Sequence, residues 1–177
     1  MAEGFGLVHL YYGDGKGKTT AAMGLALRAL GRGYPVVIVQ FLKRGDSGEI
    51  QALRHFERIT ALAYPQLPGF SMRMTPEQKA ACWKAHMELF QQAQQLCRQS
   101  PQGLLVLDEA VGACRKGLLD EQALLSFLDR RPAGWEIVLT GRDPSAQMLA
   151  RADYATQMKK EKHPFDRGLA ARDGIER

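Results

Sequence analysis

The sequence lacks the features that mark membrane-spanning, secreted and disulfide-rich proteins. No apolar run approaches the roughly 20 uncharged residues that a membrane span requires. The first residues, Met1–Phe5, do not form a basic segment followed by a long apolar one, so we expect no signal peptide. The three cysteines, Cys82, Cys97 and Cys114, form no Cys-x-x-Cys pair, which disfavours a disulfide framework or a zinc site. We therefore expect a cytoplasmic protein with reduced thiols.

The sequence also lacks a large excess of either positive or negative charge. The net charge is +5 over 177 residues, and no block of five or more like charges occurs. So small an excess fits an anionic small molecule as well as nucleic acid, and we predict neither a nucleic-acid nor a membrane partner. The apolar fraction of 45% and the charged fraction of 24% are ordinary for globular proteins. A chain of this length and composition predicts a single domain over residues 1–177.

Apolar runs alternate with helical patterns along the chain. Strands are expected over 6–12, 35–42, 59–63, 104–108, 136–140 and 155–158, and helices over 19–31, 49–56, 76–99, 120–131 and 144–152. Such alternation requires crossover connections, so it predicts an α/β fold with a mostly parallel sheet of about five or six strands between helical layers. Ligands bind such sheets at the carboxyl ends of the strands.

A glycine-rich loop lies between the first expected strand and the first expected helix. Its glycines allow a tight turn whose N–H groups point into one concavity, and the helix that follows adds its positive end. The lysine before the threonines can reach phosphate oxygens, and the first threonine can ligate Mg²⁺. The loop is one residue shorter at its start than the usual phosphate-binding loop. The residues expected to bind ATP here are Gly13, Asp14, Gly15, Lys16, Gly17, Lys18, Thr19 and Thr20.

An acidic strand end supplies the expected partner of this loop. The apolar run 104–107 ends in Asp108 and Glu109, as in the Walker B element of RecA-like P-loop proteins. We predict a Mg²⁺ site formed by Thr19, Asp108 and Glu109, directly or through water. The alternative is that the acidic pair only caps a helix. In an ATPase Glu109 would orient an attacking water, whereas with another nucleophile it is free to act on the metal.

Two arginines are candidates for further contacts to ATP. Arg142 follows the expected strand 136–140, so it belongs to the ligand-bearing edge of the sheet, where a guanidinium can bind phosphate oxygens. Arg28 lies about three turns into the first helix. The alternative for each is a solvated surface side chain.

Several stretches taken together resemble the ATP:corrinoid adenosyltransferases of the CobA/BtuR type. The resemblance implies transfer of the 5′-deoxyadenosyl group of ATP to the cobalt of a reduced corrinoid, with release of tripolyphosphate. It implies ATP, Mg²⁺ and a corrinoid as ligands, Lys18, Thr19 and Glu109 as catalytic residues, a flavoprotein as possible reductant, and a homodimer. The early first glycine of the loop, odd by the general rule, is what that family shows. The matching stretches are 13–22, 39–43, 48–49, 107–109, 139–142, 152–153, 162–166 and 174–176.

The same resemblance implies roles for two less regular segments. In the family an apolar wedge beneath the corrin lies in a segment with a Phe-x-Trp pattern, which Phe70 and Met72 match with methionine in place of tryptophan. The alternative for this pair is core packing beneath a loop. The resemblance places the irregular tail 159–177, with His163, in the active site. His163 can equally well hydrogen-bond a turn, because a proline follows it.

Two other functions compete with adenosyl transfer. A P-loop kinase or ATPase would move the γ-phosphoryl group to an acceptor or to water, and would use the same loop and acidic pair. A non-catalytic protein would bind and deliver the corrinoid or the nucleotide without turnover. The identity of the product separates the three.

Overall fold

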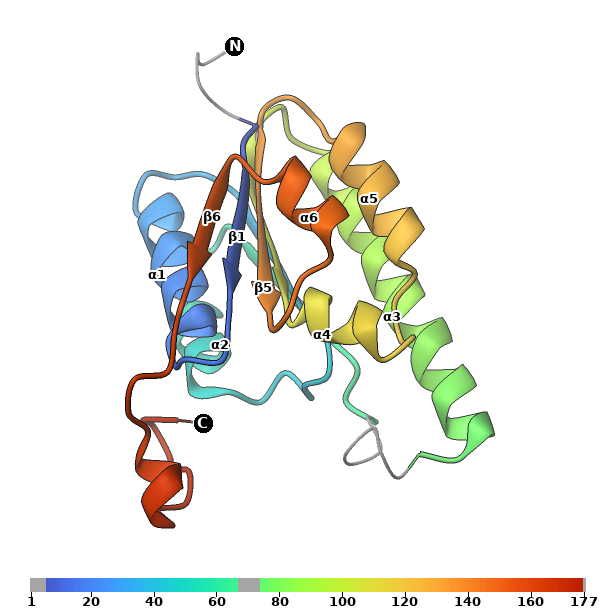
Figure 1. The fold of residues 1–177 in the computed structure, drawn as a ribbon. Coiled ribbons are helices and arrows are strands. Elements are labelled where there is room, and N and C mark those ends of the chain that lie inside the picture. Colours follow the sequence, from blue (N-terminus) through green and yellow to red (C-terminus); the bar gives the residue numbers. More distant parts are fainter. Residues whose placement is uncertain (1–5, 67–73, 177) are drawn as a thin grey trace.

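The computed structural model describes residues 6–66 and 74–176. Its centre is a six-stranded sheet in the order β3-β2-β4-β5-β1-β6, and all the strand pairs are parallel (Figure 1). The sheet confirms the predicted fold class. The strands are β1 (Val8–Tyr12), β2 (Val36–Gln40), β3 (Ile59–Ala63), β4 (Gly103–Asp108), β5 (Trp135–Gly141) and β6 (Tyr154–Gln157).

Helices cover both faces of the sheet. The helices α1 and α2 pack on one face, and α3, α4, α5 and α6 on the other (Figure 1). Between the layers the strands alternate their side chains: in β4, Leu105 and Leu107 join the core under α3 to α6, whereas Leu104 and Val106 join the core under α1. The helices are α1 (Lys18–Leu30), α2 (Gly48–Leu53), α3 (Pro76–Cys97), α4 (Ala110–Arg115), α5 (Glu121–Asp129), α6 (Ala146–Arg151) and the 3₁₀ helix η2 (Pro164–Arg167).

Most element boundaries lie within a few residues of the sequence predictions. Helix α3 begins with a reciprocal cap, in which Gln78 N–H donates to Thr75 Oγ1 and the Gln78 side chain accepts from Thr75 N–H. Helix α4 was not predicted, because it is only six residues long and contains Gly112. The three cysteines are free, and burial raises the pKa of Cys97 and Cys114 to about 12.

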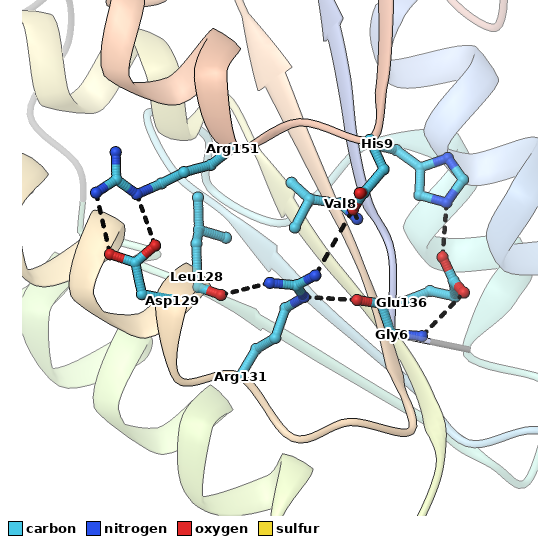
Figure 2. Close-up of polar contacts among 9 residues, drawn as sticks. Gly6, Val8, His9, Leu128, Asp129, Arg131, Glu136 and Arg151 are labelled. Atoms are coloured by element: carbon cyan, nitrogen blue, oxygen red, sulfur yellow. Dashed lines mark hydrogen bonds and ion pairs between the residues drawn. The ribbon is translucent and has the colours of Figure 1, made fainter. Parts of the chain in front are cut away.

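A polar network closes the amino ends of the strands (Figure 2). Arg131 donates to the carbonyl oxygens of Gly6 (2.6 Å) and Leu128 (2.7 Å) and pairs with Asp153 at 3.6 Å. Asp153 in turn accepts the Val8 N–H at 2.7 Å, so the network ties α5 and β6 to β1. Among the described residues no helix is long and apolar enough to cross a membrane.

Candidate active site

The glycine-rich loop joins the carboxyl end of β1 to the first turn of α1. Gly13 and Gly17 have left-handed backbones, with φ of 113° and 116°, which side chains disfavour. A Cβ atom at Gly13 or Gly15 would lie 2.4 or 2.7 Å from the carbonyl oxygen of Met158. These two glycines therefore let the chain that leaves β6 pass directly against the loop.

The same contact decides which loop amides face a ligand. Gly13 N–H donates to the carbonyl oxygen of Gly141 at 3.2 Å, and Gly15 N–H donates to that of Met158 at 2.7 Å. Both amides are thus bound within the protein. The N–H groups that could bind phosphate belong to the later part of the loop and the first turn of α1.

Lys18 is drawn into the loop. Its Nζ donates to the carbonyl oxygen of Gly15 at 2.7 Å, and the residue is only 8% exposed. Burial lowers the pKa of Lys18 and the positive charge of Arg142 lowers it further, while Glu109 is the first of the carboxylates that oppose the shift. A buried ammonium held by one carbonyl is well placed to exchange that partner for phosphate oxygens.

Asp108, at the end of β4, is the buried centre of the site. The hydroxyls of Thr19 (2.9 Å) and Thr140 (2.7 Å) donate to its Oδ1, and Lys43 Nζ (2.6 Å) and Gln40 Nε2 (3.3 Å) donate to its Oδ2. Asp108 is fully buried. The structure thus brings the predicted pair of Thr19 and Asp108 into direct contact.

Glu109 adopts an unusual backbone conformation. Its φ is 61°, in the left-handed region, and its N–H donates to Thr140 Oγ1 at 2.8 Å. It precedes α4, but its side chain makes no capping hydrogen bond, so the interpretation of the acidic pair as a helix cap is not supported. The side chain instead lines the cavity beside the loop.

Two cavities flank the glycine-rich loop. The larger, of about 590 Å³, contains residues of the loop, of the segment 43–49 and of the tail, together with Glu109. The smaller, of about 220 Å³, lies between the loop and the tail. The larger is lined by Lys16, Gly17, Lys18, Thr19, Thr20, Lys43, Arg44, Asp46, Ser47, Gly48, Glu49, Glu109, Asp173, Ile175 and Glu176. The smaller is lined by Asp14, Gly15, Lys16, Lys18, Arg142, His163, Pro164, Phe165, Leu169, Ala170, Ala171 and Glu176.

The tail continues from β6 past the carboxyl edge of the sheet and contacts the loop (Figure 1). Lys160 N–H donates to Asp14 Oδ1 at 3.0 Å, and this bond is the main cause of the lowered pKa of Asp14. Near the end, the Arg172 side chain and backbone donate to Glu176 and hold the pKa of that carboxyl at about 2. Glu176 lines both cavities.

The remaining predicted residues differ in whether they lie beside the glycine-rich loop. Arg142 and His163 both line the smaller cavity. His163 also caps η2, because its Nδ1 accepts the Phe165 N–H at 3.2 Å. The side chain therefore hydrogen-bonds a turn, as the alternative predicted, and also borders the cavity. Arg28 lies exposed in the last turn of α1 and lines neither cavity beside the loop, which leaves its predicted contact to ATP without support. Phe70 and Met72 lie outside the described residues.

The donor set fits a magnesium ion better than a transition metal. Within residues 6–66 and 74–176 no group of three or more His, Cys, Asp or Glu is arranged to hold a metal. Mg²⁺ requires less from a protein: one or two carboxylates or hydroxyls, with waters and substrate phosphates as the other ligands. Thr19, Asp108 and Glu109 supply such a set, and an ammonium, that of Lys43, already lies against two of them.

The contacts of Lys43 and Thr140 to Asp108 are among those that reasoning from the residues missed. Lys43 follows β2 by three residues, and Thr140 lies near the end of β5. Both contact Asp108 because parallel strands end at a common edge of the sheet. Residues that are far from β4 in the sequence can therefore lie next to it in the fold. Their position at the end of a buried strand, or shortly after it, was the feature of the sequence that could have indicated these contacts.

Comparison with known proteins agrees with this geometry. The family model described as ATP:corrinoid adenosyltransferase BtuR/CobO/CobP matches residues 4–177. The chain is 35% identical over 178 residues to the corrinoid adenosyltransferase of Pseudomonas aeruginosa, an alignment that covers 97% of this chain and 83% of that protein. It is 32% identical over 175 residues to the corrinoid adenosyltransferase of Escherichia coli K12, covering 97% of this chain and 85% of that protein.

A solved structure supports the fold alone. EssC (ATPases 2 and 3) from Geobacillus thermodenitrificans superposes with a TM-score of 0.55 at 13% identity, covering 95% of this chain and 36% of that chain. The chain thus shares its overall fold, with the six-stranded parallel sheet, with that structure. The full-length family match, the two relatives and the site around Thr19 and Asp108 lead to one conclusion: this chain belongs to the ATP:corrinoid adenosyltransferase family BtuR/CobO/CobP.

Proposed function

We propose that this chain transfers the 5′-deoxyadenosyl group of ATP to the Co(I) of a reduced corrinoid and releases tripolyphosphate. The observation that carries the proposal is the buried Lys18 in a glycine-rich loop whose next residue, Thr19, bonds the acidic strand end Asp108, in a chain that belongs to this family. The loop, Glu109 and the tail line the larger cavity, and the smaller cavity shares Lys16, Lys18 and Glu176 with it.

The proposed reaction asks little acid–base chemistry of the protein. Co(I) is itself a strong nucleophile that attacks C5′ of the ribose, the C5′–O bond breaks, and its electron pair leaves with the triphosphate. No serine, cysteine or histidine needs activation. The protein must hold C5′ in line with the cobalt and stabilise the negative charge that grows on the departing oxygen.

Lys18 and the loop are suited to the second of these tasks. Lys18 exchanges the Gly15 carbonyl for phosphate oxygens, and the N–H groups of the first turn of α1 add the positive end of that helix. The carbonyl bond keeps the ammonium in the loop before ATP arrives. Little reorganisation is then needed when the charge develops.

A magnesium ion would be held by Thr19, Asp108 and Glu109. When bound, it supplies charge neutralisation for the triphosphate. Asp108 is fixed by its threonine and glutamine partners, so it presents its carboxylate in one orientation. Glu109 is less constrained: its side chain lines the larger cavity directly.

The other ligand contacts are proposed from the resemblance and the placement of residues. Gly13, Asp14, Gly15, Lys16, Gly17 and Thr20 belong to the ATP loop, and Arg142 and His163 line the smaller cavity beside it. Phe70 and Met72 form the apolar surface beneath the corrin. We further propose that a flavoprotein delivers the electron that makes Co(I), and that the chain works in the cytoplasm as a homodimer, which light scattering of the purified protein tests.

The test is the identity of the products. Purified protein is incubated with ATP, Mg²⁺ and a chemically reduced corrinoid; the cobalt–carbon bond is followed by absorbance and the phosphorus products by ³¹P NMR. We expect an adenosylated corrinoid and intact tripolyphosphate in equal amounts. ADP or orthophosphate would instead show a kinase or an ATPase. Tight binding without either product would show a carrier protein.

A further inference from the structure

Lys43 occupies a cation position on the acidic strand end. Its Nζ lies 2.6 Å from Asp108 Oδ2 and also donates to Thr19 Oγ1 at 3.1 Å. It therefore bridges the buried carboxylate and the hydroxyl of the glycine-rich loop. The other partners of Asp108, which are Gln40, Thr140 and Thr19 itself, are neutral. Lys43 thus supplies the positive charge closest to a carboxylate that is fully buried.

A divalent cation and this ammonium exclude each other. A metal bound between Thr19 and Asp108 needs a lone pair of the threonine oxygen and one of the carboxylate, at about 2.0–2.1 Å for Mg²⁺. Lys43 Nζ takes a lone pair of each of those groups. Asp108 Oδ2 accepts from Lys43 and Gln40, and Oδ1 accepts from Thr19 and Thr140, so each lone pair of the carboxylate already has a donor. Two positive charges held by one buried carboxylate would also repel each other. Lys43 is the charged partner that borders the cavity, so it is the one that a metal bound to both residues would displace.

Two buried polar atoms without a hydrogen-bond partner belong to residues of the same region. In the ranges 6–66 and 74–176, Gln40 Oε1 and Ser47 Oγ are the buried side-chain oxygens and nitrogens that lack a hydrogen-bond partner. Gln40 contacts Asp108 through its other amide atom, and Ser47 lines the larger cavity, which Lys43 also lines. Buried acceptors are rarely left unpaired. The water ligands that Mg²⁺ keeps in proteins are donors that could satisfy such atoms.

The two members of the ion pair differ in freedom to move. Asp108 has no exposed side-chain surface, whereas 32% of the Lys43 side chain is exposed. Lys43 also borders the cavity of about 590 Å³ that we assign to the triphosphate, together with Lys16 and Lys18. A long, flexible ammonium at the rim of this cavity can swing from the carboxylate to a polyanion without any change in the backbone.

We propose that Lys43 is a positioning residue that takes the place of the divalent ion. In the nucleotide-free protein its ammonium neutralises Asp108 and holds the Thr19 hydroxyl in position. When the metal binds with ATP, the ammonium moves into the cavity and contacts the triphosphate. The divalent ion therefore competes with Lys43, and the free protein binds it weakly until the nucleotide offers the ammonium another partner. The inference rests on the proposed function only in naming the triphosphate.

The competition is tested with Mn²⁺ and no nucleotide. Mn²⁺ has the same preference for oxygen ligands as Mg²⁺ and is counted directly by electron paramagnetic resonance. Wild type is compared with Lys43→Met, which keeps the apolar stem and removes the charge. The matched control is Lys16→Met, which removes one positive charge from the same cavity without a contact to Asp108. If Lys43 competes, Lys43→Met binds Mn²⁺ at least about tenfold more tightly than wild type, the size of one lost charged hydrogen bond.

The control variant separates competition from general charge repulsion. Lys16→Met changes the Mn²⁺ affinity much less than Lys43→Met does. Equal affinities of the two variants, or weaker binding by Lys43→Met than by wild type, would overturn the inference. Because neither ATP nor corrinoid is present, this result does not depend on which reaction the protein catalyses. The wrong phosphorus products would contradict the proposed function, whereas an unchanged Mn²⁺ affinity would contradict the inference.

Thermal unfolding gives a second readout. Without Lys43 the buried Asp108 carboxylate has lost its nearest positive charge, so the variant is less stable than wild type in the absence of metal. Millimolar Mg²⁺ raises the melting temperature of Lys43→Met but not that of wild type. Lys43→Gln, which keeps a donor on a shorter stem, serves the same comparison if Lys43→Met does not fold. Equal responses of wild type and variant to Mg²⁺ would contradict the proposal.

Discussion

The two edges of the parallel sheet differ in how completely their charged groups are paired. At the amino edge the charges are paired and bonded: Arg131 contacts two carbonyl oxygens and Asp153, and Glu136 accepts from Gly6 N–H (3.2 Å) and pairs with His9 (2.7 Å) (Figure 2). At the carboxyl edge Asp108 is paired with the partly exposed Lys43, but Lys18 is buried with a single carbonyl partner among the bonds described. One edge is built for stability, and the other keeps its groups available for a ligand.

Backbone strain follows the same division. The non-glycine residues with positive φ in the described ranges are Leu42, Glu109 and Asp143, with φ of 57°, 61° and 51°. They follow β2, β4 and β5, so all three lie at the carboxyl edge. Such conformations cost free energy and persist where the surrounding structure enforces them, often at functional sites. The orphaned atoms Gln40 Oε1 and Ser47 Oγ lie at this edge as well.

The largest effect should come from Lys18→Ala, which separates activity from stability most sharply. We expect adenosyl transfer to fall by at least roughly 10²–10³-fold, because one preorganised group that stabilises the leaving triphosphate is lost. The lowered pKa of Lys18 means that burial disfavours its charged form, so removing it should not lower the melting temperature. Initial rates with pre-reduced corrinoid and thermal unfolding measure the two quantities. Activity like that of wild type would contradict the assignment of Lys18.

At the amino edge the opposite result is expected from Arg131→Met. The variant loses hydrogen bonds to two carbonyl oxygens and the ion pair with Asp153, which should cost about 2 kcal/mol of unfolding free energy and roughly 4–8 °C in melting temperature. The ratio kcat/KM, measured well below the melting temperature, should stay that of wild type. Arg130→Met, an exposed neighbour, is the control. A loss of activity without loss of stability would break the division between the edges.

The features that the sequence could predict are those that depend on residues close together in the chain. The strands β2 and β4 contain the continuous apolar runs 36–39 and 104–107 and end at Gln40 and Asp108, so their place in a buried parallel sheet was predictable. The glycine-rich loop 13–20 between a strand and a helix was predictable for the same local reason, whereas its contacts to phosphate remain a prediction.

What could not be predicted was the set of contacts made between segments that are distant in sequence. That Met158 passes against Gly13 and Gly15, and that Lys43 reaches Asp108, depends on which strands are neighbours and where each one ends. The order β3-β2-β4-β5-β1-β6 is a tertiary property that no local pattern encodes. Phe70 and Met72 remain predictions.

A smaller effect should reveal the strain at Glu109. Glu109→Ala and Glu109→Gly both remove the carboxylate, and we expect both to lower the rate of adenosyl transfer to the same extent. They differ in stability: glycine adopts a φ of 61° freely, so the glycine variant should be more stable than the alanine variant by about 1 kcal/mol. Urea unfolding of the two variants measures the difference. Equal stabilities would show that the backbone at Glu109 stores no strain.

The smallest effect is expected for the exposed pair of Arg151 and Asp129. Arg151 donates two hydrogen bonds to Asp129, at 2.8 and 3.0 Å, and these bonds lower the pKa of the carboxyl. Because the folded pKa is lowered, the pair stabilises the protein fully above the ordinary pKa of aspartate and loses this contribution as the pH falls through the folded value. Asp129→Asn should therefore shift the melting temperature at neutral pH less than Arg131→Met does. The shift should shrink further in about 1 M salt, which screens exposed charges. A salt-independent shift as large as that of Arg131→Met would show that this pair, too, fastens the structure.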